Sequence, residues 1–348
     1  MNHHYSLEKT QKTGVLLIQL GTPTSPSLLN VARYLREFLS DPRVIDIPSW
    51  ARLLLVNGII VPFRSYKSSQ LYKQLWKLSG GSSPLLTNTL GVEQLLQAEF
   101  DPQRVLIKAA MRYQKPSISK AMEELQEFNP DHLVVIPLFP QYASATSGSA
   151  IESALQHISK GWVIPEISVV SQFYQEDGFI DSVIAQTKDI DLSQFDHILF
   201  SYHGLPQRHL DKTYAREKCT EGACHRELPS FGKFCYKACC YHTSRLLAER
   251  LQISEEKYTV CFQSRLNNKW IKPFADQVIV DLAKRGAKRV LVFSPSFVSD
   301  CLETTLEIGE EYLNLFREAG GVSLHLVPST NTSPEFIKFL GTLIKGRL

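Results

Sequence analysis

The sequence contains 348 residues, of which 43% are hydrophobic and 21% are charged, and its net charge at neutral pH is +3. This balance is typical of a folded globular protein and excludes a disordered, collagen-like or coiled-coil chain, while the small net charge gives no indication of nucleic-acid binding. The length suits two α/β domains of about 150 residues each, or one large domain. No apolar run approaches the roughly 18 residues of a transmembrane helix, and the polar start MNHHYSLEKTQKTG lacks the apolar core of a secretory signal. The sequence therefore predicts a cytoplasmic protein with reduced thiols.

Short apolar runs that end at Gly, Pro or Ser recur along the chain and predict strands buried on both faces, as in a parallel sheet. The clearest are Val15–Leu20, His132–Ile136, His197–Phe200, Thr259–Phe262 and Arg289–Phe293, and the weaker ones are Val105–Ala109, Ile167–Val170 and Val322–Val327. Segments with helical periodicity lie between them, at Ser27–Leu39, Ser117–Phe128, Cys240–Leu251 and Ala275–Arg285. This alternation predicts βαβ units and parallel sheets with helices on both sides.

The chain repeats this plan. Gly14–Pro23 resembles His197–Pro206, and His132–Leu155 resembles Arg289–Glu311. We therefore expect two similar Rossmann-like α/β domains, an N-terminal one over residues 1–165 and a C-terminal one over residues 166–330. Residues 331–348 are expected to form a helix that begins at Ser333 and Pro334 and packs back onto the protein.

Four loops are predicted at the carboxyl ends of strands, where ligands bind in open α/β sheets. They are Leu20–Pro23, Pro137–Ser149, Ser201–Pro206 and Ser294–Glu303. The third loop carries His203 directly after a strand and before Gly204. A neutral imidazole at that place can accept a proton near pH 7 or bind a borderline metal ion. The alternative is a histidine that only makes a hydrogen bond within the turn.

The fourth loop leads into an acidic helix that carries Glu303, Glu307 and Glu311. One interpretation is a solvated acidic face, which is common and costs little. The other is a row of hard oxygen ligands that passes a divalent cation inward. If Glu303 lies opposite His203, the pair can bind Fe²⁺ and accept protons. Two ligands hold a metal weakly, which suits a metal that is passed on.

Eight motifs distributed over almost the whole chain resemble those of the ferrochelatases, the lyases that insert Fe²⁺ into a porphyrin to make haem. They are LIQLGTP, YLREFLSDPRVI, GGSSPL, MRYQKP, FPQYASATSGS, SYHGLP, FQSR…W and FVSDCLETTLEIGEEY. The resemblance implies a chelatase-like fold of two similar domains, each with a four-stranded parallel sheet, and a cleft between them. It implies that the substrates are Fe²⁺ and protoporphyrin IX, that two protons are released, and that the product is protohaem, in the last step of haem biosynthesis.

The resemblance also implies roles for individual residues. His203 and Glu303 are the active-site pair, with the order in which they receive iron left open, and Glu307 and Glu311 form an acidic path. The porphyrin pocket is assigned to Leu20, Arg112, Tyr113, Tyr142, Trp270 and Phe297. Gln263–Trp270 is one residue shorter than the family pattern, which leaves the placement of Trp270 open. Cys301 stands where many members have His, and Leu20 stands where the coproporphyrin-using branch has Tyr, which favours protoporphyrin IX.

The apolar segment Trp50–Phe63 has two interpretations. It suits a buried helix, and by resemblance it lies where the family has an apolar lip over the porphyrin pocket. An exposed lip could also rest on a membrane, with the protein peripheral to its inner face.

Five of the seven cysteines fall between Cys219 and Cys240. Cys219, Cys224, Cys235 and Cys240 have the spacing C-x₄-C…C-x₄-C, which in a reducing compartment suits Zn²⁺ or an iron–sulfur cluster. The alternative is a set of unrelated buried thiols, and an exchange of Cys240 for Cys239 stays open. Some bacterial ferrochelatases carry an internal cysteine-rich segment, and this resemblance favours a [2Fe-2S] cluster.

Two other functions stay open. A cobalt or coproporphyrin chelatase would keep the pair of His203 and Glu303 and change the pocket. A haem- or metal-binding carrier would lack catalysis and would tolerate the loss of the base.

Overall fold

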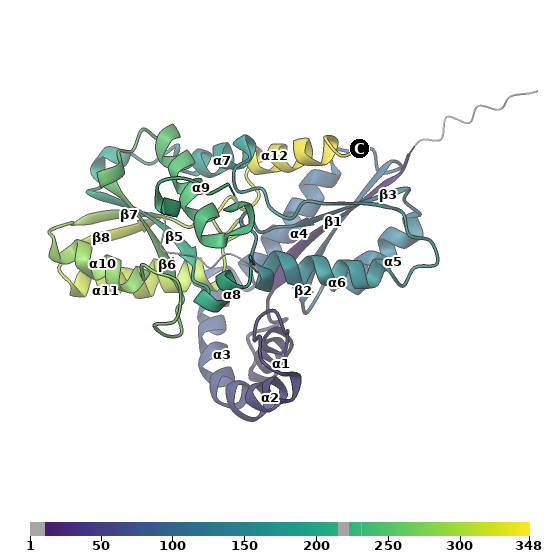
Figure 1. The fold of residues 1–348 in the computed structure, drawn as a ribbon, viewed down its shortest axis with the longest axis horizontal. Helices are drawn as coiled ribbons and strands as arrows, with labels where there is room; N and C mark the ends of the chain where they lie inside the picture. Colours follow the sequence, from purple (N-terminus) through teal and green to yellow (C-terminus); the bar gives the residue numbers. More distant parts are fainter. Residues whose placement is uncertain (1–10, 215–222, 231) are drawn as a thin grey trace, which may run out of the picture.

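Two parallel sheets with equivalent strand orders form the framework of the protein (Figure 1). The computed structural model describes residues 11–214, 223–230 and 232–348. The first sheet has the order β2-β1-β3-β4, and its strands are β1 (Thr13–Gly21), β2 (Val105–Tyr113), β3 (His132–Pro137) and β4 (Glu166–Val169). The second has the order β6-β5-β7-β8, with β5 (His197–His203), β6 (Tyr258–Gln263), β7 (Arg289–Phe293) and β8 (Ser323–Leu326). All neighbouring strands are parallel, and each of the eight predicted runs overlaps one strand, so the predicted fold class is confirmed.

The central strand β1 shows why these sheets are buried on both faces. Its residues Val15–Ile18 are fully buried, and they alternate between two hydrophobic cores. Val15 and Leu17 belong to one core, and Leu16 and Ile18 to the other, because successive side chains of a strand point to opposite faces.

One of these cores joins the two halves of the molecule. It contains Leu17 of the first sheet, Phe200 and Phe293 of the second, and Phe336 and Phe339 of the C-terminal helix α12 (Pro334–Lys345). Helix α12 lies against α7 (Asp177–Ile184) and α4 (Pro84–Gln97). Strand β4 pairs with β3, so the first sheet extends to Val169. The limits of the two domains remain a prediction.

Helices connect the strands and cover the sheets (Figure 1). In the first half they are α1 (Leu28–Leu39), α2 (Ser49–Leu54), η1 (Leu55–Ile60), α3 (Val61–Leu78), α4, α5 (Ile118–Phe128), η2 (Ser144–Gly148) and α6 (Ser149–Ile158). In the second half they are α7, η3 (Ala185–Thr187), η4 (Leu192–Gln194), α8 (Gln207–Asp211), η5 (Ala223–His225), η6 (Gly232–Phe234), α9 (Tyr236–Arg250), η7 (Glu255–Lys257), α10 (Ala275–Lys284), η8 (Glu303–Tyr312), α11 (Leu313–Glu318) and α12. Ser27, Ser117 and Ser333 cap α1, α5 and α12 through their side-chain oxygens.

The segment Trp50–Phe63 is helical and projects from the body of the protein. In Figure 1 the helices α1, α2 and α3 lie below both sheets. Trp50 is 70% exposed and Phe63 is 78% exposed, and Leu53, Leu54 and Ile59 are also exposed. The interpretation as a buried helix is therefore wrong for these residues. No helix in the described part of the chain is long and apolar enough to span a membrane.

Candidate active site

His203 is the last residue of β5 and lies at the carboxyl edge of the second sheet. Its Nδ1 lies 2.7 Å from the carbonyl oxygen of Gly204. Because a carbonyl oxygen only accepts hydrogen bonds, Nδ1 carries the proton and Nε2 keeps a free lone pair. The carbonyl oxygen of His203 accepts a hydrogen bond of 2.9 Å from the hydroxyl of Tyr236. The backbone and the ring tautomer of His203 are thus both fixed.

The turn after His203 requires a glycine. A Cβ atom at Gly204 would lie 2.7 Å from the carbonyl oxygen of Gln263, which accepts a hydrogen bond from the amide of Gly204. Gln263 is the register partner of His203 in β6. The close approach of these two chain segments explains why Gly follows the histidine in the SYHGLP motif.

Two aromatic side chains flank the imidazole. The ring centroids of Trp270 and Phe297 each lie 6.4 Å from that of His203. Trp270 forms an isolated antiparallel β-bridge with Pro206. The short loop 263–270 therefore still returns beside the histidine. The sequence-predicted residues His203, Trp270 and Phe297 therefore come together.

Glu303 begins the π-helix η8, a helix type that is frequent at functional sites. Its half-buried side chain lies close to the N-terminal helices, since burial and then the Glu303 carboxylate raise the pKa of Tyr34 in α1. The pKa of Tyr72 in α3 is raised by burial, by Tyr34 and by Glu303. Burial, with Glu303 second, also raises the pKa of the Cys301 thiol, so Cys301 stays protonated.

The residues around Glu303 form an apolar cluster that spans both halves of the chain. It contains Tyr34, Tyr72, Tyr113 and Leu306, and Leu20 and Leu302 pack against it. Leu20 and Tyr113 are thus gathered on the side of Glu303, while Trp270 and Phe297 are gathered on the side of His203.

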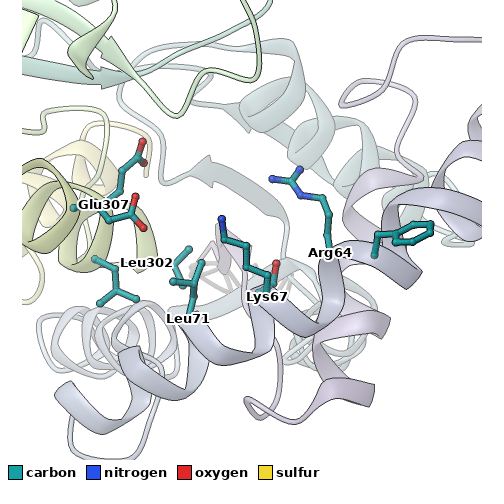
Figure 2. Close-up of a pocket in the computed structure, with 9 residues that line it drawn as sticks. Arg64, Lys67, Leu71, Leu302 and Glu307 are labelled. Atoms are coloured by element: carbon teal, nitrogen blue, oxygen red, sulfur yellow. The ribbon is translucent and has the colours of Figure 1, made fainter. Parts of the chain in front are cut away.

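A cavity of about 280 Å³ lies between α3 and η8. Figure 2 shows Arg64 and Lys67 extending from α3 into this space, with Glu307 on the opposite wall. The complete lining consists of Phe63, Arg64, Lys67, Ser68, Leu71, Leu302, Leu306, Glu307 and Glu311. Arg64 and Lys67 were not singled out from the sequence, although their spacing puts both on one face of a helix.

Arg112 and Tyr113 converge on a buried aspartate that the sequence analysis did not identify. Asp41 accepts hydrogen bonds from Arg112 Nη2 at 2.7 Å and from the Tyr113 hydroxyl at 2.9 Å, and the guanidinium lies 4.6 Å from the Tyr113 ring centroid. Burial, followed by the charge of Asp41, raises the pKa of Tyr113. Asp41 belongs to the quoted motif YLREFLSDPRVI, in which Arg36, Glu37 and Arg43 are also charged, so its charge alone could not mark it as buried.

Tyr142, the remaining residue predicted for the porphyrin pocket, contacts other side chains than those described above. Its ring makes an edge contact with Phe234, at 5.4 Å between centroids, next to the cysteine-rich segment. Its hydroxyl lies 2.9 Å from where a Cβ of Gly148 would stand, which explains the small residue in the η2 turn.

The described cysteines divide between the surface and the core. Cys224 and Cys235 are half-buried, whereas Cys239 and Cys240 of α9 are buried. Burial raises the pKa of Cys239 to about 12 and that of Cys240 well above its ordinary value, so both are thiols rather than thiolates. Cys219 lies outside the described residues. Within residues 11–214, 223–230 and 232–348, no group of three or more His, Cys, Asp and Glu side chains could hold a metal ion. The described thiols therefore do not form a metal site by themselves.

The known proteins that this chain resembles in sequence are ferrochelatases. The family model described as Ferrochelatase matches residues 12–348. The chain is 40% identical over 351 residues to a ferrochelatase of Coxiella burnetii (strain CbuG_Q212), covering 99% of this chain and 96% of that protein. It is 41% identical over 336 residues to a ferrochelatase of Legionella pneumophila subsp. pneumophila (strain Philadelphia 1), covering 96% and 98%.

Solved structures with the same fold are more distant in sequence. SirB from Bacillus subtilis with Fe³⁺ has a TM-score of 0.55 and 12% identity, covering 96% of this chain and 95% of that one. The sirohydrochlorin chelatase SirB from Bacillus subtilis subspecies spizizenii in complex with cobalt has a TM-score of 0.53 and 11% identity, covering 97% and 94%. At these identities the likeness shows the fold alone.

Proposed function

The chain belongs to the ferrochelatase family, the porphyrin metal chelatases of haem biosynthesis, and from this premise we propose that His203 and Glu303 insert Fe²⁺ into protoporphyrin IX. The observation that carries this assignment is the hydrogen bond from His203 Nδ1 to Gly204, which leaves Nε2 as a free base at a strand end. A cobalt or coproporphyrin chelatase would have the same pair of residues and a different porphyrin pocket. Leu20, which stands where the coproporphyrin-using branch has Tyr, supports protoporphyrin IX as the substrate.

The reaction explains why a base and a carboxylate are both needed. A free porphyrin carries two pyrrole N–H protons that point into a planar ring, and a metal cannot enter until the ring puckers and both protons leave. We assign proton acceptance to His203 Nε2, which takes the two protons one after the other and releases the first to water before it accepts the second. The Glu303 carboxylate balances the positive charge that the imidazole gains when it is protonated, and it offers an oxygen to Fe²⁺. Binding energy at the ring edges offsets the cost of distortion.

The porphyrin is proposed to lie against the apolar side chains beside His203 and those of the cluster around Glu303. Trp270 and Phe297 would contact one part of the ring and Leu20 another, with Arg112, Tyr113 and Tyr142 further along the wall. Glu307 and Glu311 are retained as the proposed acidic path. The cavity supports this arrangement, because Arg64 and Lys67 provide cations for the carboxylates of a porphyrin while Glu307 and Glu311 lie on the facing helix.

The exposed apolar segment supports a proposed contact with a membrane. Trp50, Leu54 and Phe63 present an uncovered apolar surface beside the cavity, together with Arg64 and Lys67. Such a surface suits the interface of an anionic lipid bilayer, in which an apolar porphyrin dissolves.

We propose that the cysteine-rich segment binds a [2Fe-2S] cluster, with Zn²⁺ as the alternative. The clustering of five cysteines and the half-buried thiols of Cys224 and Cys235 support it, and the exchange of Cys240 for Cys239 stays open. Purified protein with a cluster is brown and bleached by dithionite, and a colourless protein with one bound zinc supports the alternative. The predicted ligands are Cys219, Cys224, Cys235 and one of the two thiols Cys240 and Cys239. Of the variants Cys240→Ser and Cys239→Ser, the one that loses the metal identifies the fourth ligand.

Anaerobic fluorimetry tests the main proposal. Free protoporphyrin fluoresces, and its signal should disappear when Fe²⁺ is added to the enzyme. A parallel reaction with coproporphyrin measures the preference. Binding of porphyrin without turnover would instead identify a carrier.

A further inference from the structure

Glu307 is half-buried on η8 and makes more hydrogen bonds than a ligand of the acidic path needs. Its Oε1 accepts from the amide of Ser264 at 2.8 Å and from the hydroxyl of Tyr312 at 2.9 Å. Its Oε2 accepts from the hydroxyl of Ser264 and from Gln263 Nε2, the latter at 3.3 Å. An ionised carboxylate has about four acceptor sites, so these four donors occupy all of them.

The backbone at Ser264 is shaped to make this contact. Ser264 has a φ of 61°, in the left-handed region that residues other than glycine rarely adopt. This conformation ends β6 and turns both the amide and the hydroxyl of one residue toward the same carboxylate. A strained conformation at such a place persists only where the surrounding contacts hold it.

Gln263 extends the contact to the other side of the sheet edge. It is 1% exposed, and its Oε1 accepts a hydrogen bond of 2.8 Å from the hydroxyl of Ser201 in β5. Its carbonyl oxygen accepts from the amide of Gly204 at 2.8 Å, and the carbonyl oxygen of Gly204 in turn accepts from His203 Nδ1. A continuous series of contacts therefore runs from Glu307 through Gln263 and Gly204 to the imidazole of His203.

The two ends of this series belong to the two elements that carry the proposed chemistry. Glu303 begins η8, four residues before Glu307, and His203 ends β5. We infer that Glu307 is a positioning residue, which holds η8 against the β5–β6 edge and so sets the place of the His203 imidazole. The inference rests on the proposed function of His203 and Glu303. It gives Glu307 a positioning role in place of the ligand role proposed for it on the acidic path, and the test below decides between the two.

The test compares Glu307→Gln and Gln263→Leu, alone and combined, with Glu310→Gln as the matched control. Glu310 lies on the same helix and bonds to Gln74 rather than to the β6 turn. The readouts are kcat and the KM values for Fe²⁺ and protoporphyrin under anaerobic conditions, with thermal melting to verify folding. Glu307→Gln should lower kcat by about 10²-fold and leave the KM for Fe²⁺ within about twofold, because a small displacement of a catalytic group is costly.

If Glu307 acts on His203 through Gln263, the kcat values of Gln263→Leu and of the double variant can also be predicted. Gln263→Leu, which removes no charge and no acidic ligand, should lower kcat similarly, and the double variant should be no slower than the slower single variant. Glu310→Gln should retain the wild-type kcat. An effect of Glu307→Gln that appears only in the KM for Fe²⁺, or a wild-type kcat for Gln263→Leu, would overturn the proposal.

A measurement that is independent of turnover separates this inference from the proposed function. In protein labelled with ¹⁵N-histidine, the His203 imidazole resonance, assigned with His203→Ala, should shift in Glu307→Gln and stay in place in Glu310→Gln. An unchanged resonance overturns the positioning role at any rate of turnover. Wild-type turnover by His203→Ala overturns the proposed function, while the resonance still reports whether Glu307 positions the ring.

Discussion

At the scale of single residues, His203 has one free nitrogen. Its Nδ1–H is bound to the Gly204 carbonyl, which leaves the lone pair of Nε2 for the proposed role as base. We expect His203→Ala to lower the insertion of Fe²⁺ or Zn²⁺ by about 10²- to 10⁴-fold, the range of general-base contributions. Porphyrin binding, measured by quenching of porphyrin fluorescence, should stay near the wild-type value. Normal turnover by this variant would remove His203 from the mechanism.

Glu303 contributes a charge in a partly apolar place, beside the phenols of Tyr34 and Tyr72. Glu303→Gln keeps the shape of the side chain and removes the charge, so turnover should fall by about 10²-fold or more. Steady-state rates at saturating Fe²⁺ check this. The exposed Glu318 of α11 supplies the control variant Glu318→Gln, and a wild-type rate in Glu303→Gln would assign Glu303 to the scaffold.

At the scale of elements, α3 presents two cations to the cavity and several apolar groups to its surroundings. Arg64→Ala combined with Lys67→Ala should raise the KM for protoporphyrin about tenfold with kcat retained, because charge-assisted hydrogen bonds to the substrate carboxylates are lost. Lys77→Ala, an exposed cation at the far end of the same helix, is the control. If the effect persists with the dimethyl ester of the porphyrin, the two cations do not bind its carboxylates.

The exposed apolar surface of α2 and α3 predicts a measurable affinity for lipid. Trp50→Ser combined with Phe63→Ser should weaken binding to vesicles of phosphatidylcholine and phosphatidylglycerol by about tenfold or more, since both aromatic side chains would leave the interface. Sedimentation of the protein with vesicles measures it. Trp162 is fully exposed between α6 and β4, and Trp162→Ser is therefore a matched control. Equal sedimentation of all three proteins would contradict the membrane contact.

At the scale of the whole molecule, Asp46 ties the segment between α1 and α2 to α8, which follows His203. It accepts from Arg208 Nε at 2.7 Å and from Lys212 Nζ at 2.6 Å, and His209 Nε2 lies 3.4 Å away. Burial by itself would raise the pKa of Asp46, but these partners outweigh it and hold its pKa well below the ordinary value. The contact therefore joins the lip to the second half of the chain through an ionised carboxylate.

The sign of the pH dependence follows from that direction. A carboxyl whose pKa is lowered by folding stabilises the protein above its unfolded pKa, about 4, and loses this contribution as pH falls through the folded value. We expect Asp46→Asn to lower the free energy of unfolding by about 1 kcal/mol at pH 7, because both cationic partners are more than half exposed. The difference in melting temperature between variant and wild type should shrink below about pH 4. Asp189→Asn, at an exposed site, is the control, and a pH-independent difference would contradict the ionic origin.

Local patterns in the sequence were sufficient for the eight strands, the parallel sheets and the family. Apolar runs such as Val15–Leu20 report burial on two faces, and motifs such as SYHGLP and FVSDCLETTLEIGEEY combine a reactive residue with the turn that presents it. These properties depend on neighbours in the chain. For that reason the sequence was sufficient to predict His203 and Glu303 as the active-site pair, which stays a prediction.

Only the tertiary structure decided which distant residues meet. Asp41 lies more than 70 positions from Tyr113, Glu307 more than 40 from Gln263, and Leu17 shares a core with Phe339. Composition could not distinguish an exposed Trp50–Phe63 from a buried one, because an apolar helix has the same pattern in both cases. Such contacts are set by how the two sheets and the lip pack in space, and this arrangement depends on the sum of many weak contacts that no short segment of the chain contains.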